Sequence, residues 1–297
     1  MSSKAGLIRW YDSIHQLADQ ADKSPKDATC LSVSDDRDMG KDWHGTTSLE
    51  ESIRFAKYGG WEPKVATEFR DMFDQFMPKL RGFIENAFEP GVDHAGYEVN
   101  MQAYLDGEPE NMFQFLPSEH QVTKRALCLL LGHSISGGCS SKELFIRGQA
   151  AVALVRALSL LGYELEIWSE ETISGSGGGT LSTLCRLHGA GEVMDESAVE
   201  FAVGNPSWLR RLIFACQETE SDAVRTQFNC KVGGGYGGCV SPQHAETVNA
   251  DIVLDLGRTW FDEGWGDTDK QAAAGFDWVV QQLKDAGVLD KDAEVEL

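Results

Sequence analysis

Apolar residues recur along this chain with two periods, and the clearest pattern lies between residues 125 and 168. Residues 126–131 (Ala-Leu-Cys-Leu-Leu-Leu) form a continuous apolar run, which is typical of a strand covered on both faces. A helical pattern follows from about 141 to 161 and ends at Gly162. Residues 163–168 then alternate between apolar and polar side chains. We therefore predict a strand–helix–strand unit with two parallel strands and a right-handed crossover.

Further patterns extend this unit towards the C-terminus. Residues 181–188 and 252–256 are expected to be strands, with helices at about 196–202 and 207–218 between them. Residues 269–286 are expected to form a closing helix. Together these elements predict an α/β fold with three layers and a mainly parallel sheet.

The chain before residue 95 has a helical and polar pattern instead. The apolar positions of residues 7–21 lie close to one face of a helix, and another helix is expected from about 63 to 89. Between them, Ser48 and Glu51 have the spacing of a capping box, and the helix that they begin ends at Gly59-Gly60.

A short β element follows this helical part. Residues 97–103 alternate between apolar and polar side chains, and residues 112–115 are expected to form a second short strand. We predict a helical N-terminal segment over residues 1–95 and an α/β domain over residues 96–297, which includes the β element at 97–117.

Composition narrows the classes of partner. The chain has 26 Lys and Arg against 47 Asp and Glu, which gives a net charge of −21. Such an acidic chain repels polyphosphate, so nucleic acid is not expected as a partner. The N-terminus has no apolar signal-peptide core and no long apolar run occurs, so neither secretion nor a membrane span is expected. The odd number of cysteines, seven, at irregular spacings favours free thiols in a reducing compartment.

The loop Gly132-His133-Ser134-Ile135-Ser136 holds the first candidate chemistry, because it follows a buried parallel strand. It is close to the Gly-x-Ser-x-Gly nucleophile elbow, with Ser134 as nucleophile and Ser136 in place of the second glycine. A serine hydrolase would then need His244 with Asp195 or Asp222. We keep a serine hydrolase that uses Ser134 as an alternative function.

The same loop has the x-Ser-x-Ser spacing of a metal-ion-dependent adhesion loop. Ser134 and Ser136, with Thr180 from a later loop, are the candidate Mg²⁺ ligands. The leading Asp of that pattern is Gly132 here, and three neutral hydroxyls hold Mg²⁺ poorly. A zinc site at the cysteines is not expected either, because no paired Cys-x2-Cys is present. We therefore expect no metal and no other cofactor.

Residues 134–168 resemble the von Willebrand factor A-type fold, with Arg147 inside the helix and the strand ending at Trp168. More narrowly, the chain resembles a group of uncharacterised tailed-phage proteins with a degenerate domain of this type. Residues 48–61, 104–112 and 205–212 carry that resemblance, which covers most of the chain. It implies a phage origin and a fold, in the host cytoplasm or the virion, but no reaction.

Arginine side chains complete the set of candidate binding residues. Arg147 is expected either to pair with an internal acid that locks the loop or to bind an anionic group. Of Arg210 and Arg211, we expect one to be buried and one exposed. A single-stranded nucleic-acid-binding accessory factor of phage replication or transcription would use them with Trp208 and Tyr236 as stacking groups; this is a second alternative.

The preferred interpretation is a phage-encoded, non-enzymatic binding or adaptor protein. It would engage a host or phage protein with the carboxyl edge of an A-domain-like sheet, without a membrane. The candidate residues of that edge are His133, Ser134, Ser136, Arg147, Thr180, Arg210 and Arg211.

Overall fold

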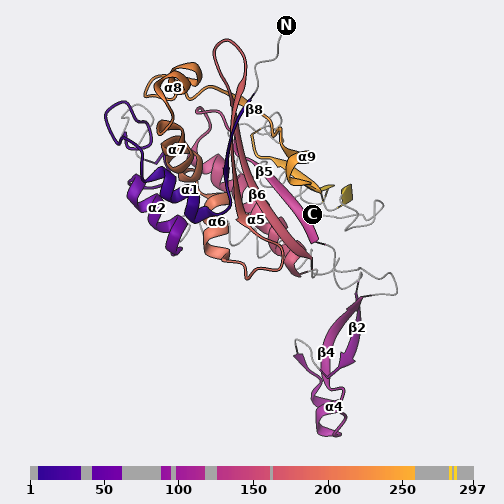
Figure 1. Ribbon diagram of the computed structural model, residues 1–297. Coiled ribbons are helices and arrows are strands. Elements are labelled where there is room, and N and C mark those ends of the chain that lie inside the picture. Colours follow the sequence, from indigo (N-terminus) through magenta and orange to yellow (C-terminus); the bar gives the residue numbers. More distant parts are fainter. Residues whose placement is uncertain are drawn as a thin grey trace.

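The computed structural model describes residues 6–34, 42–61, 88–94, 98–117, 126–160 and 163–257, with 281, 282, 284 and 285. Within these ranges the main sheet has the strand order β1-β7-β6-β5-β9, and β8 pairs with β6 (Figure 1). Its strands are β1 (Leu7–Tyr11), β5 (Ala126–Gly132), β6 (Glu164–Ser174), β7 (Thr180–His188), β8 (Gly238–Val240) and β9 (Ile252–Asp255). The sheet is mixed and mostly parallel, so the expected α/β class is confirmed at this level.

The predicted strand–helix–strand unit is confirmed. Strand β5, helix α5 (Ser141–Leu160) and strand β6 follow one another, and β5 is parallel to both β6 and β9. Strand β6 continues to Ser174 and turns through a hairpin into β7, which is therefore antiparallel to it. Gly177, Gly178 and Gly179 have positive φ angles of 85–93° in this turn, a conformation that glycine adopts without strain.

The N-terminal segment was expected to be helical, but it also contains a strand. Residues 7–11 form strand β1, which pairs in parallel with β7, and helix α1 (Ile14–Ala21) begins only after Ser13. The Ser13 side chain accepts a hydrogen bond from the Gln16 N–H and caps this helix. The apolar positions fit either element locally, and the open edge of β7 decides in favour of a strand.

Helix α2 (Leu49–Tyr58) matches the prediction. Ser48 Oγ accepts a hydrogen bond from the Glu51 N–H at 3.1 Å, while the Glu51 carboxylate accepts from the Thr47 N–H at 2.7 Å. The helix ends at Gly59, whose φ is +63°. Helices α1 and α2 share one apolar core with the sheet, from Tyr11 to Leu256. The expected boundary near residue 95 therefore does not separate two cores.

Residues 88–94 and 98–117, which we call the arm, form a second sheet away from the main one (Figure 1). Strands β2 (Phe88–Asp93), β4 (Met112–Pro117) and β3 (Glu98–Val99) pair antiparallel in that order. The strand predicted at 97–103 is wrong beyond Val99, because Asn100 caps a short helix, α4 (Met101–Leu105). The helix predicted from about 63 lies outside the described residues, except for its last two, which belong to β2.

The remaining helices cover the two faces of the main sheet. They are α6 (Glu196–Gly204), the π-helical turn η1 (Trp208–Ile213), α7 (Phe214–Glu218), α8 (Asp222–Phe228) and α9 (Ala245–Val248). Leu129 and Leu131 of β5 belong to the larger core, whereas Leu130 packs with Val248 of α9 on the opposite face. This alternation places helices on both sides of β5. The closing helix predicted at 269–286 lies almost entirely outside the described residues.

Candidate functional site

The carboxyl ends of β5 and β9 meet β6 at Gly132. Gly132 is in register with Glu170 of β6 on one side and with Asp255 of β9 on the other. A Cβ atom at residue 132 would lie 2.4 Å from Pro242 Cγ, so the segment before α9 packs directly on this glycine. The loop that follows Gly132 therefore lies at the sheet edge where the sequence placed it.

Ser134 is buried and fully engaged with the β6 backbone. Its Oγ donates to the Thr172 carbonyl at 2.8 Å and accepts from the Thr172 N–H at 2.7 Å. Because both roles of the hydroxyl are taken, Ser134 has no proton directed at a base. This geometry gives the serine hydrolase hypothesis no support.

His244 pairs with Glu170 and not with Asp195 or Asp222, the acids that a hydrolase triad would need. Its Nδ1 lies 2.9 Å from an oxygen of the Glu170 carboxylate, which is wholly buried. The same carboxylate accepts hydrogen bonds from the backbone N–H of Gln243 and from the hydroxyl of Thr172. In the described residues no hydrogen bond links His244 to Ser134. The Glu170–His244 pair anchors the segment before α9 to the sheet.

The two alternative acids have structural roles. The Asp195 carboxylate accepts from the Ala198 N–H and caps α6, and Asp222 lies in the first turn of α8. Both positions favour a carboxylate because helix N-termini present free N–H groups. Neither residue takes part in the contacts of His244 that the structure describes.

Three buried arginines brace the loop and the segments around it. Arg147 Nη1 donates to the Leu256 carbonyl, and Nη2 lies 3.8 Å from Cys139 Sγ. Arg210 donates to the carbonyls of Cys139 at 2.6 Å and Trp43 at 2.7 Å, and its guanidinium lies over the Trp43 ring. Burial lowers the pKa of Arg147 and of Arg210 to about 10, so both stay charged at neutral pH.

Arg211 is buried as well, so the expectation that one of the pair is exposed is wrong. Its two Nη atoms donate to the carbonyls of Ser32 and Thr46. A planar guanidinium group can donate to two backbone carbonyls at once, so its hydrogen-bonding groups are satisfied although the side chain is buried. Arg210 therefore supports the loop from within, Arg211 holds residues 32 and 46, and neither presents its charge at the surface.

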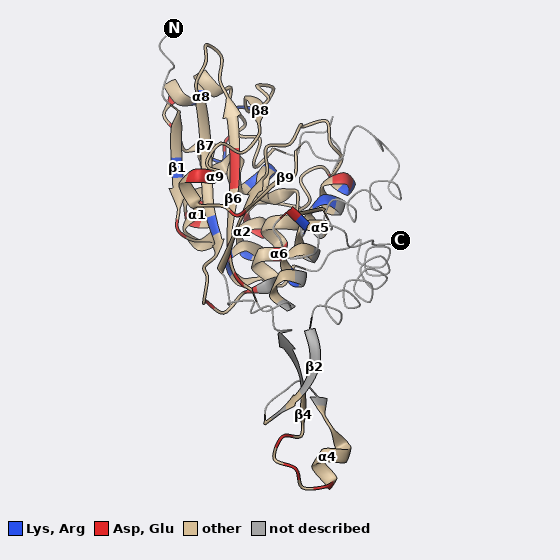
Figure 2. Cartoon of the chain, turned by 90° about the vertical axis from the view of Figure 1, so that its right-hand side faces the viewer, with Lys and Arg blue, Asp and Glu red and all other residues tan. Residues whose placement is uncertain are grey.

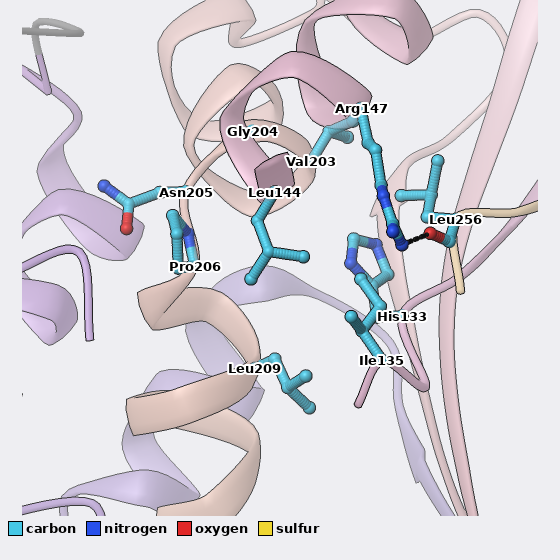
Figure 3. A pocket seen from close by; sticks show the side chains of 10 residues that line it. All are labelled: His133, Ile135, Leu144, Arg147, Val203, Gly204, Asn205, Pro206, Leu209 and Leu256. Carbon is cyan, nitrogen blue, oxygen red and sulfur yellow. Dashed lines mark hydrogen bonds between the residues drawn. The ribbon is translucent and has the colours of Figure 1, made fainter. Parts of the chain in front are cut away.

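A narrow pocket lies between the loop, α5 and the start of η1 (Figure 3). His133 and Arg147 line one side of it, and Leu144, Pro206 and Leu209 give it mainly apolar walls. Figure 3 shows the His133 ring beside the Arg147 guanidinium, which reaches to Leu256. Burial lowers the pKa of His133 to about 3, so the ring is neutral. The space is about the size of one water molecule.

The two remaining hydroxyl candidates lie apart. Ser136 is exposed, and its Oγ accepts from the Gly138 N–H at 3.2 Å. Thr180 begins β7 opposite Ser174, beside Gly6, and no contact in the described residues joins it to the loop serines. Across the described ranges no three His, Cys, Asp or Glu residues group as metal ligands. The expected absence of a metal stays a prediction.

The side chains that the nucleic-acid hypothesis requires at the surface are buried. Trp208 and Tyr236 are buried, as are Arg210 and Arg211. Trp208 donates to Ser169 Oγ, and the Tyr236 hydroxyl donates to the Glu218 carboxylate. None of the four can stack on a base or contact a phosphate at the surface.

The partners of the loop were missed from the sequence. Glu170 and Thr172 lie 36 and 38 residues after Ser134 and meet it only through strand pairing. One signal was present: Glu170-Glu171 stands inside a strand that the structure buries, and buried acids need specific donors.

Comparison with known proteins adds a family and nothing beyond it. The family described as "Domain of unknown function (DUF7192)" matches residues 3–290, nearly the whole chain. No curated protein and no solved structure matches the chain. None of the described helices has the length and apolar character that crossing a bilayer requires.

Proposed function

The chain belongs to the DUF7192 family, and we propose that it is a non-enzymatic binding or adaptor protein. In this proposal the carboxyl edge of an A-domain-like sheet engages a protein partner. The β5–α5–β6 crossover and the helices on both faces of the sheet support the A-domain-like interpretation. The resemblance of residues 48–61, 104–112 and 205–212 is the basis for also proposing a phage origin.

The observation that carries the proposal is an exposed loop that is fixed at several points. Residues 136–138 are exposed, yet the Gly137 carbonyl accepts from the Trp43 indole N–H at 2.9 Å. The loop is fixed at its start by Ser134 and at its end by Arg210 on Cys139. A surface that is already ordered loses little conformational entropy when a partner binds. Such a loop is suited to recognition by its shape and backbone groups.

Site-specific photocrosslinking tests this proposal. A benzophenone amino acid placed at Ser136 or at Gly138 should give one discrete crosslinked protein in a lysate of infected cells. A side chain can begin at Gly138 without a clash, because a Cβ atom there would have Ser136 Oγ as its nearest neighbour, at 3.6 Å. The same amino acid at Glu246, which is exposed on α9, is the control.

The result expected is a product from the loop positions alone, identified by mass spectrometry and reproduced with the purified partner. Equal products from Glu246 would contradict the proposal, because contact would then not be specific to this edge. A fluorophosphonate probe should leave Ser134 unlabelled, since its hydroxyl is buried and doubly hydrogen-bonded. Labelling of Ser134 would restore the hydrolase hypothesis.

A further inference from the structure

Helix α4 carries an apolar stripe that faces solvent. Met101, Tyr104 and Leu105 are spaced i, i+3 and i+4, so they share one side of the helix. Their exposed fractions are 61%, 59% and 72%, while Ala103 on the other side is buried. A helix normally turns such a stripe towards a core. Here the stripe is at the end of the arm, away from the main sheet (Figure 1).

The end of the arm is held in one shape by its own hydrogen bonds. The Asn100 side chain accepts from the Ala103 N–H and caps α4, and the Glu108 N–H donates to the Ala103 carbonyl at 2.9 Å. The Asn111 side chain donates to the Glu108 carbonyl at 2.8 Å and closes the turn after the helix. The stripe is therefore presented on a preformed support, which lowers the entropy that binding costs.

The charge around the stripe indicates the kind of partner. Residues 88–117 contain six Asp or Glu and neither Lys nor Arg. Asp106, Glu108 and Glu110 are exposed directly after α4, and Figure 2 shows acidic positions in red at this end of the arm. Apolar contact at the centre with charged groups at the rim is the usual anatomy of a protein interface. A second copy of this chain is a poor fit, because copies with a net charge of −21 repel one another.

We propose that the arm is a docking element of its own. Its α4 stripe binds a protein partner that has an apolar patch rimmed by Lys and Arg side chains. The acids at 106, 108 and 110 select the partner by charge and speed the encounter, and Met101, Tyr104 and Leu105 supply the buried contact. This interface is separate from the loop at residues 136–138, and either can fail without the other.

A defined peptide tests the proposal directly. The probe is a fluorescent amphipathic helix made of Leu and Lys, with all the Leu on one face, and binding to the full chain is followed by fluorescence anisotropy. Tyr104→Ser and Leu105→Ser should each weaken binding at least about tenfold. Tyr58→Ser and Val193→Ser are matched controls, because these side chains are 79% and 98% exposed elsewhere. The controls should bind as the natural chain does.

A second set of variants tests the charge. Glu108→Gln with Glu110→Gln should weaken binding and flatten its salt dependence, while Glu164→Gln with Glu246→Gln, at exposed sites outside the arm, should not. A scrambled peptide of the same composition should bind more weakly than the amphipathic one. The proposal is overturned if all variants bind alike, if the scrambled peptide binds equally well, or if the natural chain dimerises in sedimentation and Leu105→Ser makes it monomeric.

Discussion

Glu171 is a buried acid of β6 whose carboxyl group contacts Gln217 of α7. Burial raises its pKa from an ordinary value of about 4.5 to about 8, and the nearby charge of Glu170 acts in the same direction. Gln217 Nε2 donates to its carboxyl group at 2.7 Å. The folded chain therefore keeps a proton on Glu171 at neutral pH that the unfolded chain has lost.

This difference predicts a pH dependence of stability. Between about pH 4.5 and 8 the folded state binds the extra proton, so the free energy of unfolding should fall as the pH rises, by up to about 1.4 kcal/mol per unit. Glu171→Gln removes the titration and keeps an oxygen for Gln217, so the variant should gain stability over the natural chain as the pH increases. Urea unfolding at a series of pH values measures the difference. Glu164→Gln, at an exposed site, is the control; parallel curves for the two variants would refute the assignment.

At the scale of elements, the helix cap and the buried β5–α5–β6 unit were predicted correctly, whereas several contacts between distant segments were missed. The Ser48–Glu51 pair predicted the start of α2 because a cap depends only on neighbouring residues. The strand over residues 7–11 was missed because its partner, β7, is more than 170 residues away. The loop at 132–136 was placed correctly by its position after β5. Its bonds to Thr172 and its support by Arg210 depend on pairings that no local pattern encodes.

Helices α5 and α6 pack so closely that residue 148 must be glycine. A Cβ atom at Gly148 would lie 2.3 Å from Gly204 Cα and 2.5 Å from the Val203 carbonyl oxygen. These are backbone atoms, so the helices would have to separate. Gly148→Ala should therefore lower the free energy of unfolding by about 1–3 kcal/mol, although alanine has the better helix propensity.

Chemical denaturation of Gly148→Ala and Gly138→Ala gives the comparison. Gly138→Ala is the control, because it adds the same methyl group where the nearest atom is 3.6 Å away. The free energy of unfolding of this variant should stay within about 0.5 kcal/mol of that of the natural chain. A stabilised Gly148→Ala would mean that α5 and α6 do not pack this closely.

At the scale of the whole molecule, the described part of the chain outside the arm shares one dominant core. Glu218 of α7 is buried, and its carboxylate accepts hydrogen bonds from Ser24, Ser32 and Tyr236. Arg210 and Arg211 likewise use carbonyls of residues 32–46. Segments before residue 62 thus supply partners for charges buried in the second half of the chain. Removing them would take donors from Glu218 and acceptors from Arg210 and Arg211, which costs more than lost apolar contact alone.

Whether residues 96–297 fold alone tests the predicted domain boundary near residue 95. If the N-terminal segment were only an extension, residues 96–297 would fold alone. We expect that this fragment does not, because it lacks β1 at the edge of β7, the apolar faces of α1 and α2, and Ser24 and Ser32, which donate to Glu218. Circular dichroism and thermal melting should show no cooperative transition. Replacing residues 100–111 of the full chain by a short turn should leave the main transition intact, since that part of the arm contributes little to the shared core. A cooperative melt of the fragment would mean that residues 96–297 are an independent domain that folds without the N-terminal elements.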